Sequence, residues 1–254
     1  MVHPIPPVLL YACGSDANRI RSSRPMPLLS ILVPVYNEAR TVAEVLERLA
    51  VIALPCEREV VVIDDGSSDG TYEVLERYRD VAPFRILHAA KNGGKGSAIR
   101  LGLAQARGEI IAIQDADLEL DPAQIAALVE PILAGETDVV FGSRFLEKTS
   151  TAPLKTVLAN RFLTLVTNVL FGAAITDMET CYKVMRTTTA RSLDLQASRF
   201  DIEPEITAKL LKRGHRIVER PVRFEPRSRA AGKKIGWKDG VAAIGELVKH
   251  RVRS

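Results

Sequence analysis

Three short apolar segments in the first half of the chain each end in a polar or acidic turn, and each turn is followed by a stretch with helical periodicity. The segments cover residues 29–35, 59–64 and 109–114. Short apolar runs bounded by turn residues are typical of buried strands. Because strands that alternate with helices assemble into parallel sheets, the chain is predicted to be an α/β protein with a mostly parallel central sheet flanked by helices.

The rest of the chain extends this pattern and then departs from it. Further strands are expected at 84–88 and 137–142, with helices at 39–52, 71–81, 96–107 and 122–134. After residue 150 the periodicity predicts an extension made mainly of helices, at 154–172, 187–195, 204–213 and 238–250, with one strand near 216–224.

The most informative turn is Gln114-Asp115-Ala116-Asp117-Leu118-Glu119, which follows the strand predicted at 109–114. In extended chain the side chains of Asp115 and Asp117 point the same way, so their oxygens can converge on one hard cation. Ligands of open α/β sheets bind beyond the carboxyl ends of the strands, and Mg²⁺ there completes its shell with water and phosphates. The alternative is a solvated acidic turn before a helix that starts near Asp121.

Two other turns at predicted strand ends carry groups that suit a nucleotide. Asp64 and Asp65 follow the strand at 59–64, where a carboxylate can accept a hydrogen bond from a ribose hydroxyl or a base edge. Arg144 follows the strand at 137–142, and its guanidinium is suited to forked phosphate contacts. A structural salt bridge is the alternative for Arg144.

Taken together, four motifs in the first half resemble the nucleotide-sugar domain of family 2 glycosyltransferases with the GT-A fold. They read VPVYNE, IDDGSSDGT, NGGKGSA and QDADLE. In the second half, GSR at 142–144, TDMETCYKVMR at 176–186, FDIEPEITAKLLKRG at 200–214 and GKKIGWKDG at 232–240 resemble the branch of dolichyl- or polyprenyl-phosphate mannose or glucose synthases. The resemblance covers residues 28–240.

The resemblance implies a donor site for a UDP- or GDP-hexose with Mg²⁺ or Mn²⁺. Asp117 is the expected metal ligand, Asp115 meets the metal, the ribose or both, and Glu119 stands where relatives usually carry a Gln ligand. The other implied donor contacts are Asp65 with Asp64 nearby, Pro34, Tyr36 and Glu38 on the other side of the nucleoside, and Lys95 at the base or phosphates.

The resemblance also implies an acceptor side. Asp177 is expected to orient a phosphate acceptor, or to act as the base if the acceptor is a hydroxyl. Arg144 is expected near the donor or acceptor phosphates, and Arg227 and Lys233 on a loop that closes over them. Thr180-Cys181 replaces the usual Ser-Gly of the branch, which leaves the acceptor less defined than the donor.

The implied function is metal-dependent, inverting transfer of a hexose from a nucleotide-diphosphate sugar to a polyprenyl phosphate. Transfer to a soluble or other lipid hydroxyl is one alternative, and a non-catalytic nucleotide-binding module is another. The expected organisation is a disordered arm at 1–27, a nucleotide-sugar half at 28–145, an acceptor half at 146–240 and a basic C-terminal helix or tail at 241–254.

Charge and composition bear on the location. The formal net charge is only +4, but residues 212–254 hold 13 Lys and Arg against 4 Asp and Glu. This asymmetry predicts a basic surface for an anionic partner, with a solvated basic tail as the alternative, and no nucleic-acid motif accompanies it. Together with the resemblance and the amphipathic run 162–175, it predicts contact with an anionic membrane surface. No apolar run reaches the roughly 20 residues that span a bilayer, and the three cysteines form no CxxC pair. A peripheral protein at the cytoplasmic face is therefore expected, with no indication of its oligomeric state.

Overall fold

The computed structural model describes residues 26–147, 152–227 and 237–252. The predicted arm at 1–27 therefore lies almost wholly outside the described residues, as does Lys233. The strands are β1 (Leu28–Val35), β2 (Glu57–Asp64), β3 (Phe84–His88), β4 (Ile110–Ile113), β5 (Val139–Ser143), β6 (Lys183–Arg186) and β7 (Ile217–Pro221). The helices are α1 (Val42–Val51), α2 (Thr71–Glu76), α3 (Lys95–Gln105), the 3₁₀ turn η1 (Pro122–Gln124), α4 (Ile125–Leu133), α5 (Leu154–Phe171), α6 (Thr187–Ser192), α7 (Ile202–Lys212) and α8 (Trp237–Val252).

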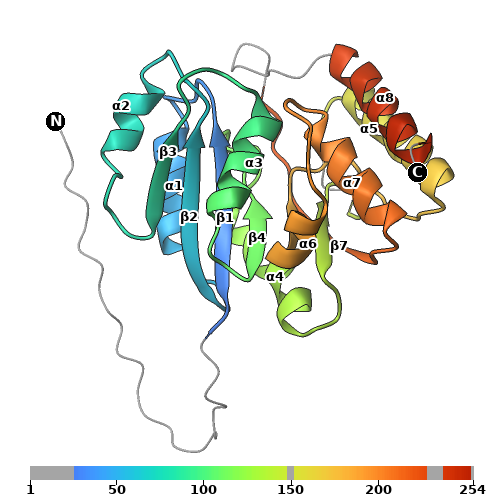
Figure 1. The fold of residues 1–254 in the computed structure, drawn as a ribbon, viewed down its shortest axis with the longest axis horizontal. Helices are drawn as coiled ribbons and strands as arrows, with labels where there is room; N and C mark the ends of the chain where they lie inside the picture. The colour runs from blue at the N-terminus through green and yellow to red at the C-terminus, as the bar shows by residue number, and fades with distance from the viewer. Residues whose placement is uncertain (1–25, 148–151, 228–236, 253–254) are drawn as a thin grey trace, which may run out of the picture.

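All seven of these strands join one sheet in the order β3-β2-β1-β4-β6-β5-β7 (Figure 1). The pairs β1–β2, β1–β4, β2–β3 and β5–β7 are parallel, which confirms the predicted mostly parallel α/β sheet. The strand order reverses beside β1, where the chain leaves β3 and returns as β4. This switch point opens a crevice at the carboxyl ends of β1 and β4.

One strand was missing from the sequence prediction. β6 lies between β4 and β5 and runs antiparallel to both. It has only four residues, two of them the charged Lys183 and Arg186, so its hydrophobic pattern is too short to read. Because β6 joins the sheet, both halves proposed from sequence share one continuous sheet.

The sheet separates two apolar layers. Successive residues of β1 face opposite sides, with Ile31 and Val33 in the layer under α1 and α4, and Leu32 in the layer under α3 and α7. All three side chains are fully buried. Burying a residue of this size contributes about 1.5–3 kcal/mol, so a strand with apolar residues on both faces is fixed at the centre of the fold.

The last helix belongs to this folded body and is not a free tail. In α8, Ala243 and Leu247 are buried in a third apolar cluster with Leu163 of α5 and Ala208 of α7. Figure 1 shows α8 beside α5 and α7 at one end of the molecule. Across the described ranges, no helix combines the length and the apolar character that crossing a membrane requires.

Candidate active site

A cavity of about 380 Å³ opens at the carboxyl ends of β1, β2 and β4. Its lining comes from the ends of these three adjacent strands and the turns after them, from the loop before α3 and the start of that helix, from the chain before α7, and from Arg227. Nine residues predicted from the sequence line it: Pro34, Tyr36, Glu38, Asp65, Lys95, Asp115, Asp117, Glu119 and Arg227. The structure thus gathers into one cavity residues separated by up to 193 positions in the chain.

Asp65 fixes the shape of the nucleoside side of the cavity. Its Oδ1 accepts a hydrogen bond from the Gly93 backbone N–H at 2.9 Å, and its Oδ2 accepts bonds from Gly94 N–H at 2.7 Å and from Asn92 Nδ2 at 2.9 Å. Gly94 has φ of +93°, and a Cβ there would lie 2.4 Å from the carbonyl oxygen of Ser198. The loop before α3 is therefore held tightly between β2 and the segment that precedes α7.

Lys95 begins α3 and reaches across the cavity floor. Its Nζ lies 2.8 Å from Asp115 Oδ1 and 3.0 Å from Glu203 Oε1. Burial lowers the pKa of Lys95, but Asp115 and Glu203 outweigh it and hold that pKa well above its ordinary value. Lys95 is thus a fixed positive charge beside one of the two aspartates predicted to serve the metal.

The second aspartate faces a different cation. Asp117 Oδ2 lies 3.1 Å from Arg227 Nη2, and the same guanidinium contacts Glu38 at 2.8 Å. Burial, and then the charges of Asp115 and Glu119, raise the pKa of Asp117 to about 7, although Arg227 opposes this shift. Like charges are therefore crowded at this point, and a bound cation would relieve the crowding.

Glu119 connects this carboxylate cluster to the C-terminal part of the chain. Its Oε1 accepts a hydrogen bond from the Arg227 backbone N–H at 2.7 Å, and its carbonyl oxygen accepts one from Glu225 N–H at 2.9 Å. Asp115, Asp117 and Glu119 carry the carboxylate oxygens that Mg²⁺ and Mn²⁺ prefer, but in this structure their ligand atoms do not all lie within 4.8 Å of one another.

Three predicted site residues are placed differently from the expectation. Asp64 is fully buried and does not line the cavity; its Oδ2 lies 2.8 Å from His88 Nδ1, and its Oδ1 accepts a bond from Ser67 N–H. The prediction of a substrate contact for Asp64 is corrected to a structural one, because the last residue of β2 points into the protein while Asp65 points into the cavity.

Arg144 and Asp177 were expected to face substrate phosphates or the acceptor, but in the structure they bind each other. Arg144 Nε and Nη2 donate to the two oxygens of Asp177, both at 2.7 Å, and the Arg144 backbone N–H donates to Asp177 as well. Asp177 is fully buried and neither residue lines the cavity. The salt-bridge alternative for Arg144 therefore describes this structure, in which both Asp177 oxygens accept hydrogen bonds from Arg144.

The sequence reasoning missed three residues that the fold brings to the site. Arg199 and Phe200 line the cavity, and Glu203 joins Lys95 of the donor side to Lys183 of β6 with an Oε2–Nζ distance of 2.5 Å. All three belong to or adjoin the motif at 200–214. That motif contributed to the family resemblance, but none of its residues was assigned a role from the sequence. Buried ionic contacts over such separations leave no local signal.

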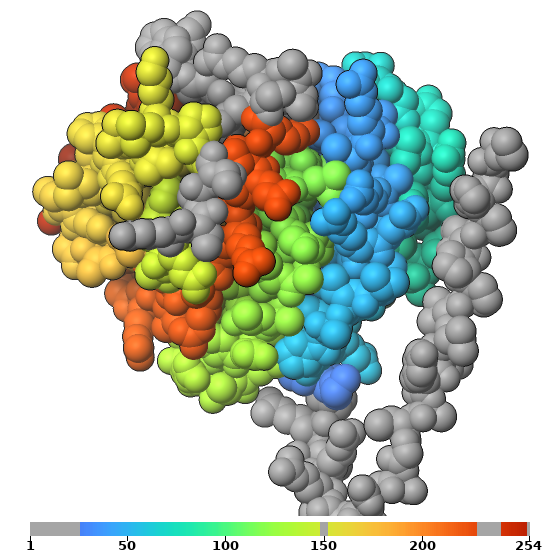
Figure 2. Space-filling model, turned by 180° about the vertical axis from the view of Figure 1, so that it is seen from behind, coloured from blue at the N-terminus to red at the C-terminus, as the bar shows by residue number. Residues whose placement is uncertain are grey.

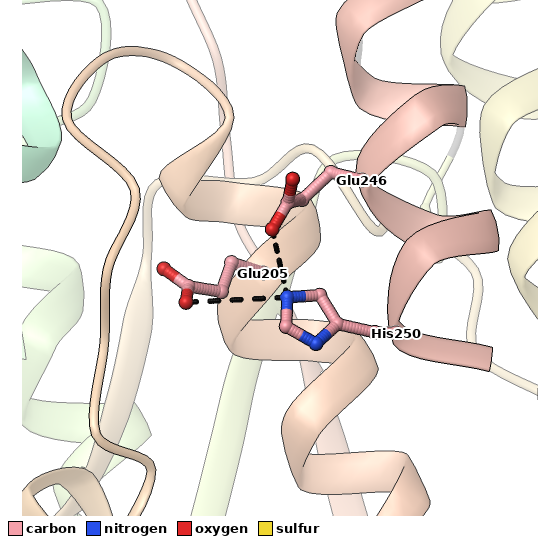
Figure 3. Close-up of side chains that lie close together, drawn as sticks. All are labelled: Glu205, Glu246 and His250. Carbon is pink, nitrogen blue, oxygen red and sulfur yellow. Dashed lines mark hydrogen bonds and ion pairs between the residues drawn. The ribbon is translucent and has the colours of Figure 1, made fainter. Parts of the chain in front are cut away.

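A second group of possible metal ligands lies outside the cavity, where His250 of α8 approaches Glu246 at 2.7 Å and Glu205 of α7 at 4.0 Å (Figure 3). Each carboxylate already has an ammonium partner, since Glu205 binds Lys209 at 2.6 Å and Glu246 binds Lys249 at 2.7 Å. These lysines supply the positive charge that an ion would bring, so the cluster is best described as a polar contact between α7 and α8.

Comparison with known proteins agrees with this geometry. The family model described as glycosyl transferase family 2 matches residues 30–193. The chain belongs to glycosyl transferase family 2. The predicted resemblance to polyprenyl-phosphate sugar transferases is confirmed by its curated relatives.

Two of these relatives are dolichol-phosphate mannosyltransferase of Pyrococcus furiosus and undecaprenyl-phosphate mannosyltransferase of Micrococcus luteus. The first is 28% identical over 89% of this chain and 63% of its own length, so this chain spans less than two thirds of it. The second is 29% identical over 84% of this chain and 90% of its own length.

Solved structures confirm the GT-A fold. Glucosyl-3-phosphoglycerate synthase of Mycobacterium tuberculosis in complex with UDP superposes with a TM-score of 0.71, at 19% identity, over 89% of this chain and 80% of that one. The same enzyme with Mn²⁺, UDP and glucosyl-3-phosphoglycerate gives a TM-score of 0.68 over 88% of this chain and 80% of that one, also at 19% identity.

Proposed function

We propose that this family 2 glycosyltransferase transfers a hexose from a nucleotide-diphosphate sugar to a polyprenyl phosphate, with Mg²⁺ or Mn²⁺ and with inversion at the anomeric carbon. The observation that carries the proposal is the cavity at the sheet's switch point, where Asp115, Asp117 and Glu119 lie opposite the cations Lys95 and Arg227. Carboxylates and fixed cations at one site suit a diphosphate with its metal.

Each group has a role in this reaction. A divalent ion held by Asp115, Asp117 and Glu119 would act as a Lewis acid for the charge that develops on the departing diphosphate. Lys95 is buried beside Asp115 and would add fixed positive charge at the same place. Pro34, Tyr36 and Asp65 line the part of the cavity formed by the turns after β1 and β2, where we place the nucleoside.

The acceptor assignment rests on the relatives and on the state of Asp177. The named enzymes of Pyrococcus furiosus and Micrococcus luteus are dolichol-phosphate and undecaprenyl-phosphate mannosyltransferases. A phosphate acceptor is already ionised and needs no base. A role for Asp177 in orienting Arg144, to which both of its oxygens are bonded, is compatible with an acceptor that needs no base.

A lipid acceptor requires access to a membrane surface, and α5 offers a suitable face. Five large apolar side chains spaced three or four residues apart lie exposed on it: Leu154, Leu158, Phe162, Leu165 and Val169. Each is at least 56% exposed. In Figure 2, α5 lies open at the side of the molecule in yellow. We propose that this face, called the α5 stripe below, enters the headgroup layer of an anionic membrane.

The test combines transfer and vesicle binding. Purified protein is incubated with UDP- and GDP-hexoses, Mn²⁺ and a short-chain polyprenyl phosphate, with Asp117→Asn as the inactive control and NMR of the product to read its anomeric configuration. We expect one donor to give an inverted glycosyl phosphate. Transfer only to a soluble hydroxyl compound, or a retained anomer, would contradict the proposal.

For the membrane, sedimentation with anionic vesicles is compared between wild type and the double variant Leu158→Gln/Leu165→Gln. We expect the variant to bind at least ten-fold more weakly, and wild-type binding to weaken as salt rises. The matched control is Val51→Gln, a change at an exposed apolar residue of α1 away from the α5 stripe. Equal binding of all three proteins would remove the membrane part of the proposal.

A further inference from the structure

Three buried side-chain polar atoms lack a hydrogen-bond partner among the described residues, and all three lie at or beside the active site. They are Glu179 Oε1, Glu203 Oε1 and Arg227 Nε. Glu203 Oε1 is still compensated electrostatically, because Lys95 Nζ lies 3.0 Å away although the angle is not that of a hydrogen bond. The other nitrogens of the Arg227 guanidinium are bonded to Glu38 and Asp117.

Glu179 is different, because neither a hydrogen bond nor an ion pair is found for its carboxylate within the described parts of the chain. Leaving a buried polar group unpaired costs about 1–3 kcal/mol, and more when it is charged. Such a group in a native structure calls for an explanation, such as a catalytic role or a bound water, ion or ligand. The unpaired oxygen of Glu179 therefore marks a place where a ligand can complete the structure.

The cations nearest to Glu179 are already engaged. Lys183 Nζ donates to the carbonyl oxygens of Met178 and Thr180 and to Glu203. Arg144 directs two of its guanidinium nitrogens at Asp177. Burial therefore dominates at Glu179 and raises the pKa of its carboxyl to about 7, with Lys183 and Arg144 opposing and Glu203 and Asp177 adding to the shift.

Glu179 lies beside the cavity without lining it. Lys183 Nζ donates to the backbone carbonyl oxygens of Met178 and Thr180, on either side of Glu179, and also to Glu203. Glu203 connects through Lys95 to Asp115 of the donor cavity, and Asp177 belongs to the segment expected on the acceptor side. The group transferred from donor to acceptor must occupy the space between these two sides.

We propose that Glu179 accepts a hydrogen bond from a hydroxyl of the hexose while the nucleotide sugar is bound, and so helps to select which sugar is transferred. This inference rests on the proposed function. A hydroxyl is the appropriate partner because it is a neutral donor, whereas a phosphate would be repelled by the carboxylate. A polyprenyl phosphate acceptor has no hydroxyl to offer, so the hydroxyl must come from the sugar.

The test separates the sugar from the nucleotide. Binding of the nucleoside diphosphate, of the nucleotide hexose and of its monodeoxy analogues is measured by calorimetry with Mn²⁺, using wild type, Glu179→Gln and the control Glu130→Gln. Glu130 is an exposed residue of α4 outside the cavity. We expect Glu179→Gln to bind the nucleotide hexose about ten- to hundred-fold more weakly and the nucleoside diphosphate unchanged.

One deoxy analogue should reproduce that loss in wild type and lose nothing further in Glu179→Gln. The variant's melting temperature should be unchanged or higher without ligand, because removing an unpaired buried charge relieves a cost that a purely structural glutamate would not have. The control variant should match wild type in every measurement.

Equal loss for nucleoside diphosphate and nucleotide hexose, or no loss for either, would overturn the inference. So would normal nucleotide-hexose binding together with a collapse of turnover on a hydroxyl acceptor, which would make Glu179 a base. Failure of the proposed function is a separate result, namely that wild type transfers nothing to polyprenyl phosphate. The binding comparison needs no acceptor, so it remains readable in that case.

Discussion

The contact between Arg227 and the carboxylate cluster gives a prediction about the protein before any metal binds. The guanidinium lies 2.8 Å from Glu38 and 3.1 Å from Asp117, and its side chain is 15% exposed. A charge pair at 3 Å is worth about 5 kcal/mol at an effective dielectric constant of 20. Desolvation of both partners offsets more than half of that, so we take about 2 kcal/mol as the net contribution of Arg227.

We therefore expect Arg227→Met to lower the metal-free stability by about 2 kcal/mol, which corresponds to about 4–8 °C in melting temperature for a chain of this size. Added Mn²⁺ should raise the melting temperature of the variant more than that of wild type. The reason is that in wild type an ion must compete with Arg227 for Asp117, and removing a 2 kcal/mol competitor strengthens ion binding by about 30-fold.

The assay is thermal unfolding in EDTA and in a saturating series of Mn²⁺ concentrations. Arg220→Met is the matched control, because Arg220 lies 3.7 Å from Glu136 on an exposed surface outside the cavity. Its melting temperature should change little in either condition, as is usual for exposed ion pairs. Identical Mn²⁺-induced increases in wild type and Arg227→Met would refute the idea that Arg227 and the ion compete for the same carboxylates.

Three further predictions concern buried charge. Asp117→Asn should lower metal-stimulated transfer at least 100-fold. It should not lower the metal-free melting temperature, because burial and the charges of Asp115 and Glu119 already raise the pKa of Asp117 to about 7, so its charge is held at a cost. A marked loss of stability would mean that Asp117 is needed for the fold. Arg144→Met should lower the free energy of unfolding, measured with urea, by about 3–5 kcal/mol, since the Asp177 carboxylate would be left buried and unpaired. Adding Asp177→Asn should restore part of that free energy. If the double variant is no more stable than Arg144→Met, the pairing argument is wrong. For Glu179, whose carboxyl pKa rises from 4.5 to about 7 on folding, the unfolded chain loses its proton first. Stability should therefore fall as pH rises from about 4.5 to 7, by up to about 3 kcal/mol, and Glu179→Gln should flatten that slope; an unchanged slope in urea titrations at several pH values would count against the shift.

The donor side of this site was largely determined by the sequence. Asp115 and Asp117 follow β4, Glu38 follows the adjacent strand β1, and Asp65 follows β2 on the other side of β1. Parallel strands bring their carboxyl ends to one edge, so the local pattern predicted that Asp65, Asp115 and Asp117 lie together. The family resemblance added Glu38 and Lys95 to this group, and the structure places both in the same cavity.

The acceptor side depended on the tertiary structure. Sequence spacing could not show that Arg144 and Asp177, 33 residues apart, satisfy each other, or that Asp64 turns inward to His88 while Asp65 faces the cavity. The antiparallel strand β6 decides the position of Lys183, and with it the pairing that leaves Glu179 Oε1 without a hydrogen-bond partner among the described residues.

The physical reason for the difference is the range of the interactions. Alternation of apolar residues, glycines at turns and carboxylates after strands are local features, and the regular geometry of a parallel sheet converts them into known positions. Ion pairs such as Lys95 with Glu203 join residues more than 100 positions apart, and the sequence alone does not say which of several opposite charges each side chain pairs with. Only the packing of α7 against the sheet decides which charges meet, which remain unpaired and which are left free to bind substrate.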